Sequence, residues 1–287
     1  MSPSIACLGK RWPARVRPTT SDSRYSPSSS IELLDRVLHD TSAPTGTGRW
    51  LLQRAAGGAA GVAAASAGIL AYSALAGDRP HGPSNGDGSI DNWGVFASTT
   101  EALTVTILDE LLRRTSLHPE VPSEVSVTFD AVYAAELDHW NFISQHFNPS
   151  TKRFWIPDGF FGGADDALDL TAVGKGVSGG ETLFVNTYLV GVTTFAKAGD
   201  AKFARYAAEA AGDESEHRVL GQTLAGASPP NNLGFEEFVF DNVGDIEAAL
   251  VGAGFGLGQE GASPGRFYDF PDPPMAPPIP ISSNEPK

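Results

Sequence analysis

Two Glu-x-x-His motifs constrain this 287-residue chain more than any other feature of its sequence. They are Glu136-Leu-Asp-His139 and Glu214-Ser-Glu-His217, and both lie in stretches whose apolar residues recur at helical spacing. Residues at i and i+3 share one face of an α-helix, so each glutamate and its histidine point the same way. Because that face is otherwise apolar, the sequence predicts buried ionisable side chains, which are unfavourable unless a partner compensates their charge.

A lone glutamate precedes each motif at nearly the same distance. Glu101 lies 35 residues before Glu136, and Glu181 lies 33 residues before Glu214. The two halves therefore look like two copies of one helical hairpin. In each copy the first helix supplies one glutamate and the second supplies Glu-x-x-His, which is the ligand set of di-iron and di-manganese carboxylate bundles.

The charge of this set predicts two bound divalent metal ions. Four ionised carboxylates balance two such ions, whereas unpaired they would have to be protonated. Hard oxygen donors with one imidazole per ion suit iron or manganese, and we expect Glu136 and Glu214 to bridge the ions. A single Glu-x-x-His is more often a solvated surface pair, so the prediction depends on the repeated pairing. The predicted ligands are Glu101, Glu136, His139, Glu181, Glu214 and His217.

The helical spacing predicts an all-α four-helix bundle over residues 91–226. The segment between the second and third helices, residues 148–177, is too long for a turn and predicts one long crossover along the bundle. The first helix is expected from Asp91 to Thr115, the second from Ser123, the third from Glu181 after two glycines, and the fourth after its cap at Asp200.

Other polar residues near the motifs are predicted to play no part in metal binding. We expect Tyr133 and Tyr188 to be ordinary core tyrosines, with hydrogen bonding to the ligands as the alternative. The acidic residues that fall off the apolar stripes are expected to be solvated, namely Glu110, Asp138, Glu209 and Glu216.

Residues 91–250 resemble the ferritin-like proteins, a group that includes the plant desiccation-related proteins and exported bacterial relatives. The resemblance rests on Glu101, Glu136-Leu-Asp-His139, Glu181 and the segment Asp213-Glu214-Ser-Glu-His217-Arg218. It implies a ferritin-like fold and two classes of function. One is a redox centre that reacts with dioxygen or peroxide. The other is a metal-stabilised structural or stress protein without catalytic turnover.

The first 76 residues have the features of a leader. Arg49 and Arg54 precede a weakly apolar run, and Ala74-Leu75-Ala76 has the form of a signal-peptidase site. This pattern predicts export to the periplasm, cell envelope or exterior, with residues 77–90 as a linker. Two alternatives remain open. Residues 55–76 could form an uncleaved membrane anchor, or the N-terminus could belong to a soluble protein.

The remaining composition narrows the classes of partner. A net charge of −14 argues against non-specific nucleic-acid binding, which requires a cationic surface. Cys7 is the only cysteine, so the chain has no internal disulfide. Residues 227–287 are rich in glycine and proline and are expected to form an irregular tail. Self-association into a homo-oligomer is compatible with these features.

Overall fold

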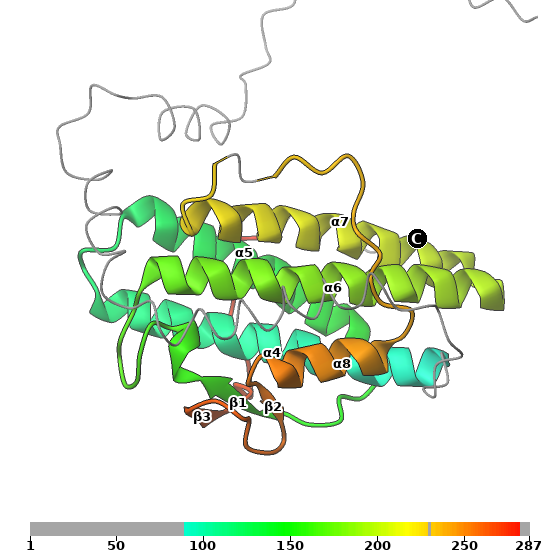
Figure 1. Ribbon diagram of the computed structural model, residues 1–287, viewed down its shortest axis with the longest axis horizontal. Helices are drawn as coiled ribbons and strands as arrows, with labels where there is room; N and C mark the ends of the chain where they lie inside the picture. The colour runs from blue at the N-terminus through cyan, green and yellow to red at the C-terminus, as the bar shows by residue number, and fades with distance from the viewer. Residues whose placement is uncertain (1–88, 229–230, 282–287) are drawn as a thin grey trace, which may run out of the picture. The chain divides into compact units, whose positions relative to one another are not determined.

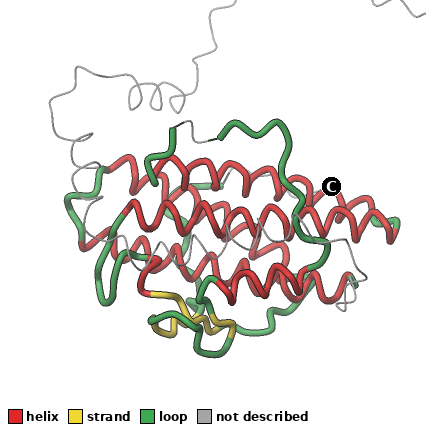
Figure 2. The backbone as a smooth tube through the Cα atoms, viewed as in Figure 1, coloured by secondary structure: helices red, strands yellow, loops and turns green. Residues whose placement is uncertain are grey.

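The computed structural model describes residues 89–228 and 231–281, which are mostly helical with a small sheet (Figure 2). The predicted leader, residues 1–76, and nearly all of the predicted linker lie outside the described residues. No helix in the described ranges is long and apolar enough to cross a membrane. The helices are α4 (Ile90–Leu117), α5 (Ser123–Ser144), α6 (Leu170–Ala198), α7 (Ala201–Leu224) and α8 (Val243–Gly252).

The four long helices pack as two hairpins that share a core. Helix α4 packs against α5, α6 packs against α7, and α4 also contacts α6 (Figure 1). Local signals set the ends of the first hairpin: the Ser89 hydroxyl caps α4 by accepting a hydrogen bond from the Asn92 N–H at 3.2 Å. Helix α4 ends at Leu117, just before Pro119, and α5 begins after Pro122.

Helix α6 begins eleven residues earlier than the sequence analysis predicted. Asp169 caps it by accepting hydrogen bonds from the N–H groups of Thr171 and Ala172, and the helix then runs through the glycines that we interpreted as a break. A glycine earlier in the helix, Gly174, lets α7 approach closely: a Cβ at this position would lie 2.5 Å from the Ala225 nitrogen. Here glycine serves close packing rather than a turn, so the segment between α5 and α6 spans residues 145–169 only.

The other end of α6 agrees with prediction. Gly199 closes the helix with a left-handed backbone, φ 78°. Asp200 then caps α7 by accepting a hydrogen bond from the Phe203 N–H at 3.1 Å. The tight turn places α6 and α7 antiparallel and side by side (Figure 1).

The C-terminal segment is not the irregular tail that the sequence analysis predicted. It contains α8, which packs on α4 and α6, and two strands, β2 (Gly256–Leu257) and β3 (Gly265–Asp269). Both strands pair antiparallel with β1 (Arg153–Pro157) from the segment between α5 and α6, in the order β2-β1-β3. The prediction gave too much weight to the glycines and prolines of this segment. Its apolar side chains are buried against the helices and stabilise a folded structure, among them Phe240, Ile246, Leu250 and Phe255.

A buried arginine joins the helices to the sheet, and it explains why Glu110 is buried rather than solvated as predicted. The Arg114 side chain is fully buried and donates to Glu110 Oε1 at 2.7 Å, to the Ala167 carbonyl and to the Tyr268 hydroxyl at 2.9 Å. Arg113 also pairs with Glu110. Two guanidinium groups thus compensate the charge of the Glu110 carboxylate as it leaves water.

Candidate metal centre

The structure brings all six predicted ligands into one buried cluster between the four long helices. Helices α4 and α6 each supply one glutamate, and α5 and α7 each supply a glutamate and a histidine. The ligand atoms form two groups, and within each group they lie no more than 4.8 Å apart. The first group is Glu101, Glu136, His139 and Glu214, and the second is Glu136, Glu181, Glu214 and His217.

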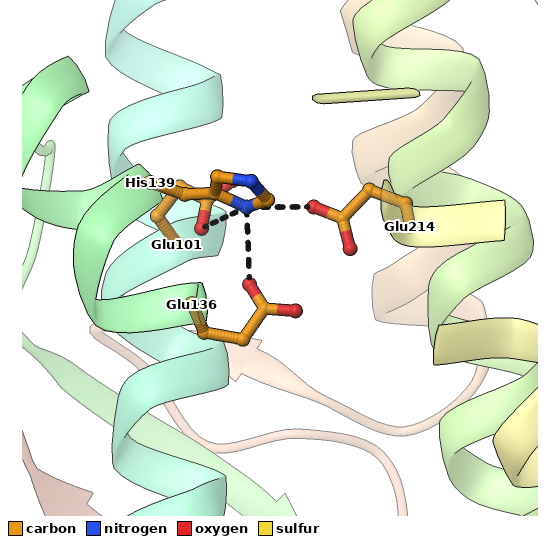
Figure 3. A group of neighbouring side chains, drawn as sticks. All are labelled: Glu101, Glu136, His139 and Glu214. Carbon is orange, nitrogen blue, oxygen red and sulfur yellow. Dashed lines mark ion pairs between the residues drawn. The ribbon is translucent and has the colours of Figure 1, made fainter. Parts of the chain in front are cut away.

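Three carboxylates surround one ring nitrogen of His139 (Figure 3). Its Nδ1 lies 3.4 Å from Glu214 Oε1, 3.6 Å from Glu136 Oε2 and 4.0 Å from Glu101 Oε2. These atoms come from α4, α5 and α7 and converge on one point, as ligands of a shared cation would.

Glu136 and Glu214 belong to both groups because each divides its two oxygens between the histidines. Glu136 places Oε2 beside His139 and Oε1 2.6 Å from His217 Nδ1. Glu214 places Oε1 beside His139 and Oε2 3.3 Å from His217 Nδ1. Both glutamates therefore lie between the two histidines, each with one oxygen toward either ring.

Several polar atoms of the cluster are buried without a well-aligned hydrogen bond, although charged groups of the same cluster lie close to them. Within the described residues, no hydrogen-bond partner satisfies Glu101 Oε2, either oxygen of Glu136, Glu181 Oε2, Glu214 Oε1 or His139 Nδ1. Buried polar atoms in folded proteins are nearly always paired, and an unpaired one requires an explanation such as a bound ion. All six atoms belong to the predicted ligands. Oxygen and imidazole donors converging in a buried site fit divalent ions such as iron or manganese.

Burial disfavours the charged form of two carboxyl groups of the cluster, Glu101 and Glu181. Burial raises the pKa of Glu101 well above its ordinary value, and the charge of Glu136 raises it further. Burial also raises the pKa of Glu181, with the charge of Glu214 as the next contribution. A divalent cation would reverse this balance by favouring the ionised carboxylates.

The position of Glu214 between the two histidines lowers the pKa of its carboxyl group. Burial would raise its pKa, but contacts with His139 and His217 outweigh burial and lower the pKa of Glu214 to about 2. Burial would likewise lower the pKa of each histidine, but the surrounding carboxylates raise the pKa of both well above the ordinary value. The surrounding carboxylates thus favour the charged form of both imidazoles.

The structure changes the interpretation of one tyrosine. Tyr188, predicted to be an ordinary core residue, donates its hydroxyl hydrogen bond to Glu101 Oε1. It lies on α6 about two turns after Glu181, and that spacing was the signal available in the sequence. Tyr133 instead donates to the Met275 carbonyl at 3.0 Å, away from the cluster. Of the acidic residues expected to be solvated, Glu209 and Glu216 are exposed and Asp138 is partly buried.

An ion pair next to the cluster attaches the C-terminal segment to α7. Arg218, one residue after His217, is buried and donates to both carboxylate oxygens of Glu236, at 2.6 and 2.7 Å. The Ser215 hydroxyl donates to the same carboxylate at 2.7 Å. The C-terminal segment therefore holds the part of α7 that carries Glu214 and His217.

Comparisons with protein-family models, with curated proteins and with solved structures give no match. The functional interpretation of the chain therefore depends on the geometry of the buried Glu and His cluster, which could hold metal ions.

Proposed function

We propose that the four long helices form a ferritin-like four-helix bundle that binds two divalent ions, iron or manganese, and reacts with dioxygen or peroxide. One observation carries this proposal: Glu136 and Glu214 each present one oxygen to His139 and the other to His217. If two ions lay side by side, each of these carboxylates could give one oxygen to either ion. The crossover of the bundle would be the segment that contains β1.

Each residue of the cluster has a distinct task in this proposal. Glu101 and His139 would complete the binding site of one ion, and Glu181 and His217 that of the other. The chemistry that iron or manganese supplies is the exchange of electrons with an oxygen species. The helices contribute a dry pocket, because nearly every ligand side chain is buried, while His139 keeps some exposure to solvent.

Aerobic addition of ferrous iron to the purified apoprotein tests the proposed reactivity. We expect uptake of oxygen together with a rise in the near-ultraviolet absorbance of ferric iron, and neither signal from the Glu214→Gln variant. Glu209→Gln is the matched control, because Glu209 is an exposed carboxylate on the same helix that pairs only loosely with Arg205 at 3.4 Å. Iron binding without oxygen uptake, with hydrogen peroxide also unreactive, would contradict the redox proposal.

A metal-stabilised structural protein is the second candidate function. The observation that favours it is the depth of the cluster, since four ligand carboxylates are buried in the middle of a large apolar core. Ions there would contribute folding free energy whether or not they react. Tight binding of metal, a large metal-dependent rise in melting temperature and no consumption of oxygen or peroxide would support this function instead.

A further inference from the structure

The segment that leads from α7 to α8 sorts its side chains in the reverse of the usual order. Its first part, residues 231–238, is called the strap below. The strap passes over α7 before the chain crosses α6 (Figure 1). Leu233, Phe235 and Phe238 are exposed, Phe235 to 92 %, whereas Glu236 is partly buried. Charged side chains are normally exposed and large apolar ones buried, so the position of Glu236 requires a specific partner.

The partner of Glu236 is the buried guanidinium of Arg218. The Glu236 carboxylate accepts hydrogen bonds from both terminal nitrogens of Arg218, at 2.6 and 2.7 Å, and another from the Ser215 hydroxyl. Among the described residues, the hydrogen bonds from the strap to the helices all end on this carboxylate, and no other carboxylate pairs with Arg218. Opening of the strap would therefore leave the positive charge of Arg218 without its partner.

Arg218 has a second carboxylate close to it on its own helix. Glu214 lies four positions earlier on α7, and side chains at i and i+4 are neighbours on the surface of a helix. A glutamate four residues before a basic residue is the favourable order for an ion pair. In the structure, however, both oxygens of Glu214 lie beside the histidines, and Arg218 is paired with the strap instead.

We propose that Glu236 is a positioning residue, and that the strap it holds regulates the affinity of the metal centre. With the strap closed, Arg218 is paired with Glu236, and Glu214 is free to bind the ions. With the strap open, the Arg218 guanidinium turns to the Glu214 carboxylate and competes with the ions for it. Because Glu214 belongs to both groups of converging atoms, opening weakens both ions. The inference rests on the proposed metal binding, but it concerns a segment that contributes no ligand.

Titration of the full chain with manganese, followed by the electron paramagnetic resonance signal of free Mn²⁺, tests this regulation. We expect Glu236→Gln to bind both ions roughly 10-fold more weakly, which is within the usual range of coupling between two sites. The double variant Glu236→Gln with Arg218→Gln should recover most of the wild-type affinity, because no guanidinium is left to compete. Glu237→Gln is the control, since Glu237 is the exposed neighbour in the same strap.

Two results of this titration would overturn the proposal. One is equal affinity in Glu236→Gln and Glu237→Gln. The other is a double variant that binds as weakly as Glu236→Gln alone, because the loss would then come from a general loosening of α7 and not from the freed guanidinium. A wild-type protein that binds no manganese would contradict the proposed metal binding itself. Normal wild-type binding with an unaffected Glu236→Gln variant would contradict only this inference.

A second measurement uses the wild-type protein and does not depend on the folding of any variant. If closure of the strap strengthens metal binding, then by linkage bound metal must favour closure. Proteases cut exposed segments that can leave the surface, and chymotrypsin cleaves after phenylalanine. Manganese should therefore slow cleavage after Phe235 and Phe238 several-fold, relative to cleavage after Phe267 in β3, as followed by mass spectrometry. Equal cleavage of the strap with and without manganese would overturn the proposal.

Discussion

At the scale of single residues, the two shared glutamates hold the cluster together. Glu136 and Glu214 are fully buried, and each contacts a histidine from the opposite hairpin. Both residues belong to both groups of converging atoms, so replacing either carboxylate changes both groups. These two positions therefore affect the whole cluster, whereas Glu101 and Glu181 each affect one half.

The first prediction concerns this sharing. In Glu136→Gln, reconstitution should leave fewer than about one ion per chain, because the amide is a poor bridge and removes one negative charge from the balance. Metal analysis of the reconstituted, desalted protein measures the result. Glu101→Gln is the comparison and should lose close to one ion. If both variants lost the same single ion, Glu136 would not be a bridge.

The second prediction concerns the hydrogen bond from Tyr188 to Glu101. Burial raises the pKa of Glu101, and the Tyr188 hydroxyl opposes this by stabilising the carboxylate. In Tyr188→Phe the pKa of Glu101 should rise further, so a proton competes better with metal at this carboxyl group. Affinity for one ion should fall by about tenfold, the equivalent of roughly 1.4 kcal/mol, and the deficit should grow as the pH falls.

Tyr133→Phe is the control for that experiment, and calorimetric titration of both variants is the measurement. Tyr133 loses a hydrogen bond of similar kind, but its partner is the Met275 carbonyl, away from the metal ligands. Metal affinity in Tyr133→Phe should match that of the wild type. Equal loss of affinity in both variants would show that the Tyr188 hydroxyl acts only through general stability.

The sequence alone predicts the role of a residue when its partners are close in the chain, and fails when they are distant. The grouping of the six residues of the cluster could be predicted because helix geometry connects residues three positions apart, and burial followed from the apolar stripes. The partners of Glu110 could not be predicted in full, since the network around it includes Tyr268, 154 residues from Arg114. The role of Tyr188 likewise depends on Glu101, 87 residues away on another helix.

At the scale of elements, close contact between α6 and α7 positions Glu181, Glu214 and His217, the three residues that this hairpin contributes to the cluster. Gly174 and Gly221 face each other across this contact, and a Cβ on Gly174 would lie 2.7 Å from the Gly221 carbonyl oxygen. The error in the predicted start of α6 came from another pair, Gly179 and Gly180, which we interpreted as a break although α6 runs through them. The sequence alone did not distinguish a glycine that ends a helix from one that lies within it.

The third prediction follows from this contact. Gly174→Ala should destabilise the protein by about 1–3 kcal/mol, because the new methyl group would meet backbone atoms that cannot move aside cheaply. Gly180→Ala in the same helix should be neutral or stabilise it by up to about 1 kcal/mol, since a Cβ there meets no atom of the described residues within 4 Å. Denaturant unfolding measures both. A destabilised Gly180→Ala with an unaffected Gly174→Ala would contradict this description of the contact.

At the scale of the whole described region, most of the core is apolar and does not depend on the cluster. Large apolar side chains such as Trp93, Phe154, Phe161 and Phe195 are buried, and Arg114 connects α4 to the small sheet. The C-terminal segment adds buried residues from α8 and its strands, which the sequence analysis did not expect. The helices should therefore survive without metal ions.

The fourth prediction is that removal of metal weakens the fold but does not abolish it. Loss of the ions would leave four buried carboxyl groups with only two histidines to balance their charge, so the melting temperature should fall by several degrees while helical circular dichroism at room temperature is retained. Thermal melts before and after chelation measure both quantities. Complete loss of helicity on chelation would show that the apolar core alone cannot hold the helices.

The stoichiometry of bound metal tests the central claim most directly. Purified protein should be reconstituted separately with iron and with manganese, freed of loosely bound ions and analysed for metal content per chain. The two groups of ligand atoms that share Glu136 and Glu214 predict about two ions per chain. A metal content near zero after both reconstitutions would contradict the account.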